Sequence, residues 1–192
     1  MAVLLTPPFA SAYFAAYPGA DVPPFWLASV RPALDDLLTF AAPRTVYDLY
    51  GRVFVLVYLL MLPAVFALHS LHRGTNGRAE KWGFYLLVAG LLLAFLGVAG
   101  DFWANGAGFL VEVLGLLILA IGATVYGAAA LRAGVLPGKV AWPLALALPA
   151  VFLVIPLIGH IPSGPTFPLA IVWVIIGAFL LLAGEKRPQL TV

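Results

Sequence analysis

The chain has 192 residues, of which 64% are hydrophobic and 9% are charged, against about 25% charged in an ordinary soluble domain. Such a chain cannot cover a water-soluble globule with polar surface, and its long apolar runs predict one all-α integral membrane protein. The net charge is +2 and the pI is near 9.0, but the ten basic residues are scattered, which excludes a nucleic-acid-binding face. The sequence has no cysteine, which excludes disulfides and thiolate metal sites.

Residues 1–44 are predicted to form an extracytoplasmic N-terminal arm. Its first apolar stretch has no basic leading region and is interrupted by Pro7 and Pro8, unlike a signal peptide. The stretch is also too short to cross a bilayer, which needs about 20 apolar residues. Residues 29–41 predict a short amphipathic helix that lies on the bilayer surface, or forms a lid or a docking surface for another subunit. Its apolar face comprises Val30, Leu34, Leu37, Leu38 and Ala41.

Five apolar runs, each bounded by charged or turn residues, predict a bundle of five transmembrane helices over residues 45–184, followed by a cytoplasmic tail, 185–192. The five runs are 45–71, 82–100, 106–131, 141–159 and 167–184. Short connections make consecutive helices antiparallel neighbours. Pro63, Pro149 and Pro156 fall inside predicted helices, and each favours a kink or a break whose freed carbonyls line a cavity.

The distribution of basic residues predicts the orientation of the bundle in a cell membrane, because cytoplasmic loops carry more Lys and Arg. Three basic residues lie on one side, Arg31, Arg44 and Arg52. Seven lie on the other side, namely Arg73, Arg78, Lys81, Arg132, Lys139, Lys186 and Arg187. The second side is therefore predicted to be cytoplasmic, with the N-terminus outside and the C-terminus inside.

The third predicted helix carries a carboxylate, Glu112, within an almost wholly apolar stretch. Glycines recur every seven residues along this helix, and Glu112, Leu119 and Tyr126 fall between them on the same stripe. The glycines of this stripe are Gly108, Gly115 and Gly122. Because glycine lets membrane helices approach closely, the stripe predicts a helix contact that holds Glu112 away from lipid.

A buried carboxylate needs a partner or a proton. Arg52 is predicted to lie as deep in the first helix as Glu112 lies in the third, roughly 10 Å from the outer boundary. We therefore expect an Arg52–Glu112 ion pair, with Asp48 one turn above Arg52. If Arg52 pairs with Asp48 instead, Glu112 is expected to be protonated.

Further polar residues are predicted at the same end of the bundle, and together they form a candidate binding site. Its members are Asp48, Arg52, Asp101, Asn105, Glu112 and His160. Two interpretations stay open. The cluster is either a structural network that fixes helix register, or a site for a ligand, ion or proton that opens outward.

The remaining histidines do not predict a cofactor site. His69 and His72 have a spacing that can share a metal ion, but Glu80 is the one acid nearby, and a structural zinc site takes four ligands. Bis-histidine haem is disfavoured because His160 is predicted at the opposite end. We predict no metal site, and leave open a porphyrin, chlorophyll, quinone or lipid bound by other residues.

No motif identifies a reaction, so an enzyme is disfavoured. The favoured hypothesis is a structural or accessory subunit of a larger membrane complex, because the chain is small and its N-terminal arm is apolar and aromatic. The alternative is a small transporter, channel or ligand-binding protein that uses the polar cluster around Glu112 and Arg52. The expected partners are the lipid bilayer and either other membrane subunits or further copies of this chain, but not nucleic acid.

Overall fold

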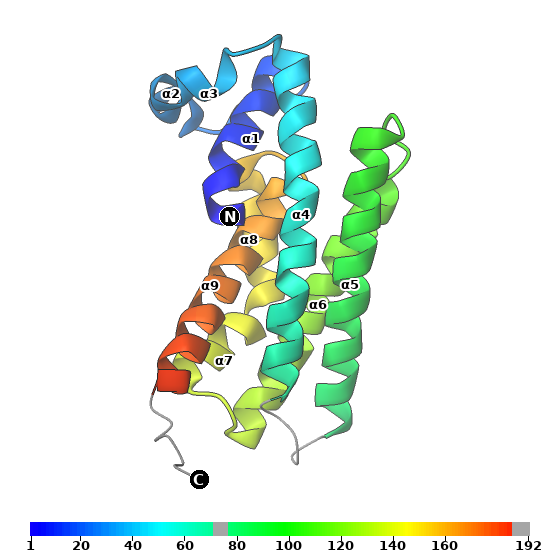
Figure 1. Cartoon of the computed structure of the whole chain (residues 1–192), viewed down its shortest axis with the longest axis vertical. Coiled ribbons are helices and arrows are strands. Elements are labelled where there is room, and N and C mark those ends of the chain that lie inside the picture. Colours follow the sequence, from blue (N-terminus) through cyan, green and yellow to red (C-terminus); the bar gives the residue numbers. More distant parts are fainter. Residues whose placement is uncertain (71–76, 186–192) are drawn as a thin grey trace.

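The computed structural model describes residues 1–70 and 77–185, and within them all regular structure is helical, as predicted (Figure 1). The elements are α1 (Ala2–Ala16), α2 (Leu27–Val30), η1 (Arg31–Leu34), α3 (Asp35–Leu38), α4 (Pro43–Ser70), α5 (Arg78–Trp103), α6 (Phe109–Ala133), α7 (Gly138–Ala145), α8 (Ala147–Ile158) and α9 (Ser163–Glu185). We call the end of the bundle with the α8–α9 turn the His160 end, and the opposite end the His69 end.

Three helices of the described part, α4, α5 and α6, are long and apolar enough to cross a membrane. The pair α7 and α8 would make a fourth span, although it bends by 63°. The apolar stretch of α9 over Ser163–Phe179 is shorter than a full span. These helices are compatible with a multi-pass membrane protein, with three or four candidate spans rather than the predicted five.

Helices α5 and α6 form an antiparallel hairpin whose backbones touch through glycines from both helices, beside α4 in Figure 1. A Cβ atom added to Gly97 would lie 2.2 Å from the backbone nitrogen of Glu112. Gly90 faces Leu119 in the same way one heptad further along. The predicted glycine stripe on residues 106–131 is thus confirmed, and its partner is a second stripe of heptad spacing on α5. That second stripe is Gly83, Gly90 and Gly97.

The predicted fourth helix, 141–159, is broken at Leu146 into α7 and α8. Pro149 has no N–H to donate to the Ala145 carbonyl, and its ring would clash with that oxygen in a continuous helix. The Leu148 N–H instead donates to the Thr124 hydroxyl of α6 at 3.0 Å. Proline therefore breaks this helix, and α6 supplies the missing acceptor.

The N-terminal arm is less separate from the bundle than predicted. Residues Ala2–Ala16 form α1, which packs against α4 and α9 in the half of the molecule toward the His160 end (Figure 1). Pro7 and Pro8 do not end this helix. Phe9 and Ala10 are fully buried, so burial of an apolar face stabilises α1 despite the hydrogen bonds that the prolines remove.

The predicted amphipathic helix over residues 29–41 is not one regular helix. The chain instead makes three consecutive short helical segments, α2, η1 and α3, with Pro32 in the 3₁₀ turn between the two α-helical ones. Leu38 of the predicted apolar face is buried, but Leu37 is 49% exposed. Trp26, next to α2, donates its indole N–H to the Leu157 carbonyl at 2.7 Å, which ties this region to the end of α8.

Candidate functional site

His160 lies in the turn between α8 and α9 and is 4% exposed. Gly159, at a φ of +68° that favours glycine, ends α8 and starts this turn. The His160 ring nitrogens have two hydroxyl partners, Tyr47 of α4 at 3.3 Å from Nε2 and Ser163 of α9 at 2.8 Å from Nδ1. Burial lowers the pKa of His160 from an ordinary value of 6.5 to about 3. The imidazole is therefore neutral at physiological pH and serves as a fixed hydrogen-bonding group.

Aromatic rings from α1 and α4 contact this histidine, and a ring from α5 packs against them. The ring centroids of Phe9 and Tyr13, both on α1, each lie 4.7 Å from that of His160. Tyr47 packs against Phe102 of α5 at 5.2 Å. The sequence did not predict Phe9 or Tyr13 in the cluster, because α1 was expected to lie outside the bundle.

A cavity of about 630 Å³ opens beside His160. Its lining residues come from α1, the loop after it, α4, α5, the start of α6, α8 and the α8–α9 turn. They are Tyr13, Tyr17, Asp21, Val22, Tyr47, Asp101, Phe109, Ile155, Pro156, Gly159, His160 and Ile161. The volume lies within the range of about 300–1,000 Å³ that small-molecule sites occupy.

Tyrosines and carboxylates supply most of the polar chemistry of this cavity. The Tyr13 hydroxyl donates a hydrogen bond to Asp21. Burial, reinforced by this hydrogen bond and by the Asp21 charge, raises the pKa of Tyr13 to about 12, so the phenol keeps its proton. Among the lining residues that the structure describes, none is lysine or arginine.

Two of the predicted site residues, Asp101 and His160, line this cavity together. Asp48 does not line it. Its carboxylate instead lies 3.3 Å from the guanidinium of Arg44, which stacks on the Tyr17 ring at 4.7 Å from the centroid. Asn105 is exposed, with a φ of 53°, in the turn between α5 and α6. The structure therefore brings only part of the predicted cluster to one place.

The predicted Arg52–Glu112 ion pair is wrong. Arg52 is exposed on α4, whose bundle-facing residues in that region are Gly51, Phe54 and Val55. Glu112 is fully buried, and its carboxyl has no hydrogen-bond partner within residues 1–70 and 77–185. The ion pair was predicted because the two residues were expected at similar depth in the membrane. Depth does not determine the direction in which a side chain points around its helix.

Glu112 lies inside the bundle, in a region with a few other polar groups. It is within electrostatic reach of Tyr58 and Asp101. The Tyr58 hydroxyl is 2.8 Å from that of Thr166, and this fully buried pair joins α4 to α9. Glu112 does not line the His160-end cavity. Because an unpaired charge in an apolar interior is very costly, we expect Glu112 to be a neutral, protonated acid.

At the His69 end, a histidine of α4 faces a buried glutamate of α5. Nδ1 of His69 lies 2.6 Å from Oε1 of Glu80, which is 4% exposed, and the imidazole stacks on Phe84 with centroids 3.9 Å apart. His72 lies outside the described residues. The described part of the chain contains no group of three side chains that could hold a metal ion.

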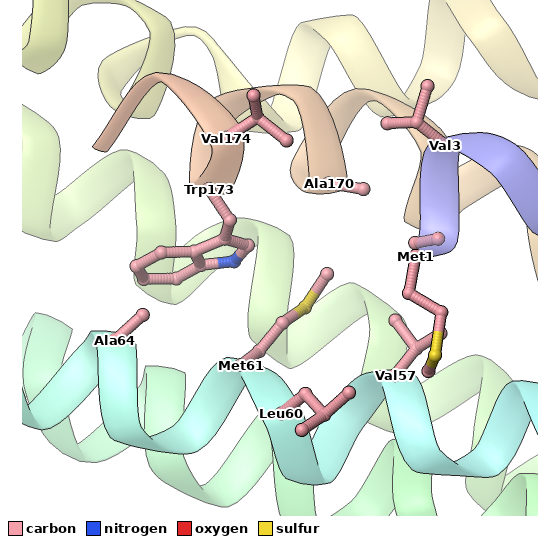
Figure 2. Close-up of a pocket in the computed structure, with 10 residues that line it drawn as sticks. Met1, Val3, Val57, Leu60, Met61, Ala64, Ala170, Trp173 and Val174 are labelled. Carbon is pink, nitrogen blue, oxygen red and sulfur yellow. The ribbon is translucent and has the colours of Figure 1, made fainter. Parts of the chain in front are cut away.

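A second cavity, of about 220 Å³, lies between α1, α4 and α9 (Figure 2). Its side chains are apolar except for the indole N–H of Trp173. The labelled residues are Met1, Val3, Val57, Leu60, Met61, Ala64, Ala170, Trp173 and Val174. These side chains offer one polar group to a ligand, whereas the cavity beside His160 offers several, so the cavity beside His160 is the better candidate site.

Comparisons of the chain with protein-family models, curated proteins and solved structures find no match. The chemistry of the His160-end cavity is therefore the basis on which a function can be inferred.

Proposed function

We propose that this protein is a small ligand-binding membrane protein, of the receptor or transporter kind, and that the His160-end cavity is its binding site. The observation that carries the proposal is a cavity of about 630 Å³ with a buried, neutral histidine in its wall. Concave sites that combine apolar and aromatic walls with a few fixed polar groups are typical of small-molecule binding. The Tyr47 and Ser163 hydroxyls hold His160 in place for such a role.

The proposal includes the orientation and span count inferred from the sequence. Five spans, with α9 as the last, would put the N-terminus outside the cell and the C-terminus in the cytoplasm. The excess of basic residues on the loops of the His69 end supports this orientation. The His160-end cavity would then face the outside and take its ligand from there.

Single introduced cysteines test whether the cavity is open to water, since the natural chain has none. Cells that express Ile155→Cys, on the cavity wall, are treated with a membrane-impermeant thiol reagent. Ile155→Cys is expected to react because its thiol can ionise in water. Val22→Cys, at a side chain 88% exposed in the loop after α1, is the positive control. Leu153→Cys is the matched negative control, since this α8 side chain is 70% exposed but is expected to face lipid.

The labelling experiment has a clear contradictory result. If Val22→Cys reacts while Ile155→Cys is as inert as Leu153→Cys, the cavity is closed to water and the proposed binding site fails. If Val22→Cys reacts only after the cells are opened, the predicted orientation is wrong, and the accessibility of Ile155→Cys is then read from the opened cells.

An accessory subunit of a larger complex is the second candidate function. The exposed apolar side chains at the His160 end favour it, since an apolar loop needs either a bilayer surface or a partner. Val22 and Phe25 are 88% and 83% exposed there. Purification from the native membrane in mild detergent distinguishes the two functions. Stoichiometric partners or a bound pigment in the sample would favour the accessory subunit, and a colourless single chain would favour the ligand-binding protein.

A further inference from the structure

We propose that the ligand of the His160-end cavity is a small organic cation, an amine or a quaternary ammonium compound. This inference rests on the proposed function, because it specifies what the same cavity binds. It is drawn from the residues that line the cavity: two carboxylates, Asp21 and Asp101, stand among three tyrosine rings, Tyr13, Tyr17 and Tyr47.

The carboxylates of the cavity are not neutralised by the groups around them. Asp21 accepts one hydrogen bond, from the uncharged Tyr13. Asp101 accepts no side-chain hydrogen bond among the described residues, and it is half-buried. Arg44 acts on Asp101 electrostatically, but its ion-pair partner Asp48 acts with the opposite sign. The lining residues thus leave a net negative charge, which a cation can complement.

The tyrosine rings add a second preference for a cation. The face of an aromatic ring attracts a cation, and quaternary ammonium ligands are often held in cages built from such rings. The ring of Tyr17 already carries a cation on one face, since the Arg44 guanidinium carbon lies 4.7 Å from its centroid. Tyr13 and Tyr47 pack 5.7 Å apart beside the same cavity, so more than one ring is within reach of a ligand there.

The chemistry of the walls disfavours a metal ion as the cation. Calcium needs six to eight oxygen ligands and magnesium a near-octahedral set. The described residues offer no group of three acids or histidines that could hold a metal. An organic cation needs fewer ligands, because ring faces and two carboxylates satisfy a diffuse positive charge without replacing a full hydration shell.

Choline and its uncharged isostere, in which carbon replaces the ammonium nitrogen, test this inference on the purified full chain. The two probes match in shape, so a difference in affinity reports the charge. We expect choline to bind at least about tenfold more tightly than the isostere in ligand-observed NMR titrations. Asp101→Asn is expected to weaken choline binding by about tenfold or more, whereas Asp36→Asn, an exposed acid on α3, leaves it unchanged.

A second measurement does not depend on the folding of the Asp101 variant. Ile155→Cys is treated with a cationic and an anionic thiosulfonate, and the ratio of the two rates is compared with that of Val22→Cys. A ratio that favours the cation by about tenfold at the cavity wall supports the inference. Equal ratios at the two positions would overturn it, as would equal binding of choline and its isostere.

The outcomes separate this inference from the proposed function. A cavity that reacts at Ile155→Cys but binds choline no better than the isostere remains a binding site for another class of ligand. If Ile155→Cys does not react and the chain binds neither choline nor its isostere, both proposals are wrong.

Discussion

Gly97→Ala is expected to destabilise the bundle strongly, because it adds a methyl group where α5 and α6 are in backbone contact. The added Cβ would lie 2.2 Å from the Glu112 nitrogen and 2.3 Å from its Cα. These are backbone atoms, so no side-chain rotation can relieve the clash, and α5 and α6 must move apart. We expect a loss of about 3 kcal/mol or more in the free energy of unfolding. For a chain of this size the melting temperature in detergent would fall by about 6 °C or more.

Gly177→Ala is the matched control for this prediction. Gly177 also lies within an apolar helix, α9, but nothing stands within 4 Å of an added Cβ there. Its melting temperature should stay the same or rise, because alanine is the better helix former. Equal effects of the two substitutions would contradict the close approach of α5 and α6.

Glu112→Lys is expected to destabilise the fold strongly, whereas Glu112→Gln is expected to be tolerated. Glu112 is fully buried and unpartnered among the described residues, so lysine would place an uncompensated charge in the bundle. That change costs about 3 kcal/mol or more. Glutamine keeps the shape and neutrality of a protonated acid, so we expect a cost below about 1 kcal/mol. Thermal unfolding of both variants in detergent provides the measurement.

The same substitution tests the ion pair that the sequence suggested. In a double-mutant cycle of Arg52→Gln and Glu112→Gln, the coupling between the two changes should be close to zero, because Arg52 is exposed and Glu112 is not paired with it. A coupling energy of about 1 kcal/mol or more would show that Arg52 and Glu112 interact, and would contradict the arrangement of α4 and α6.

The sequence predicted the parts of this fold that depend on periodicity. The heptad of glycines on residues 106–131 predicted a contact face with Glu112 on it, and the α5–α6 hairpin has that face. Gly83, Gly90 and Gly97 repeat with the same spacing, and this signal could have identified the partner helix in advance. Pro149 favoured a kink or a break, and the structure has a break at Leu146. Pro63 and Pro156 lie inside α4 and α8 without ending those helices.

The parts that could not be predicted depend on tertiary packing. The first apolar stretch was assigned to an arm outside the bundle, but it forms α1, which buries Phe9 completely. The cavity beside His160 needs Tyr13 and Asp21 from this segment, so half of its polar wall could not be anticipated. His160 and Asp101 were predicted to lie together because both fall near helix ends on the same side of the predicted bundle, and this position in the sequence is enough to place them at one end of it.

The imidazole nitrogen signals of His160, observed by NMR on protein labelled with ¹⁵N-histidine, provide the most direct test of the candidate site. The chain has three histidines, and His160→Asn assigns the signal. Because burial lowers the pKa of His160 to about 3, its signals should stay those of a neutral ring as the pH falls from about 7 to about 5. They should also shift when choline is added, while those of His69 do not. A His160 signal that titrates near the ordinary pKa of 6.5 would contradict the site proposed for this protein. So would a His160 signal that does not shift at choline concentrations that saturate the cavity.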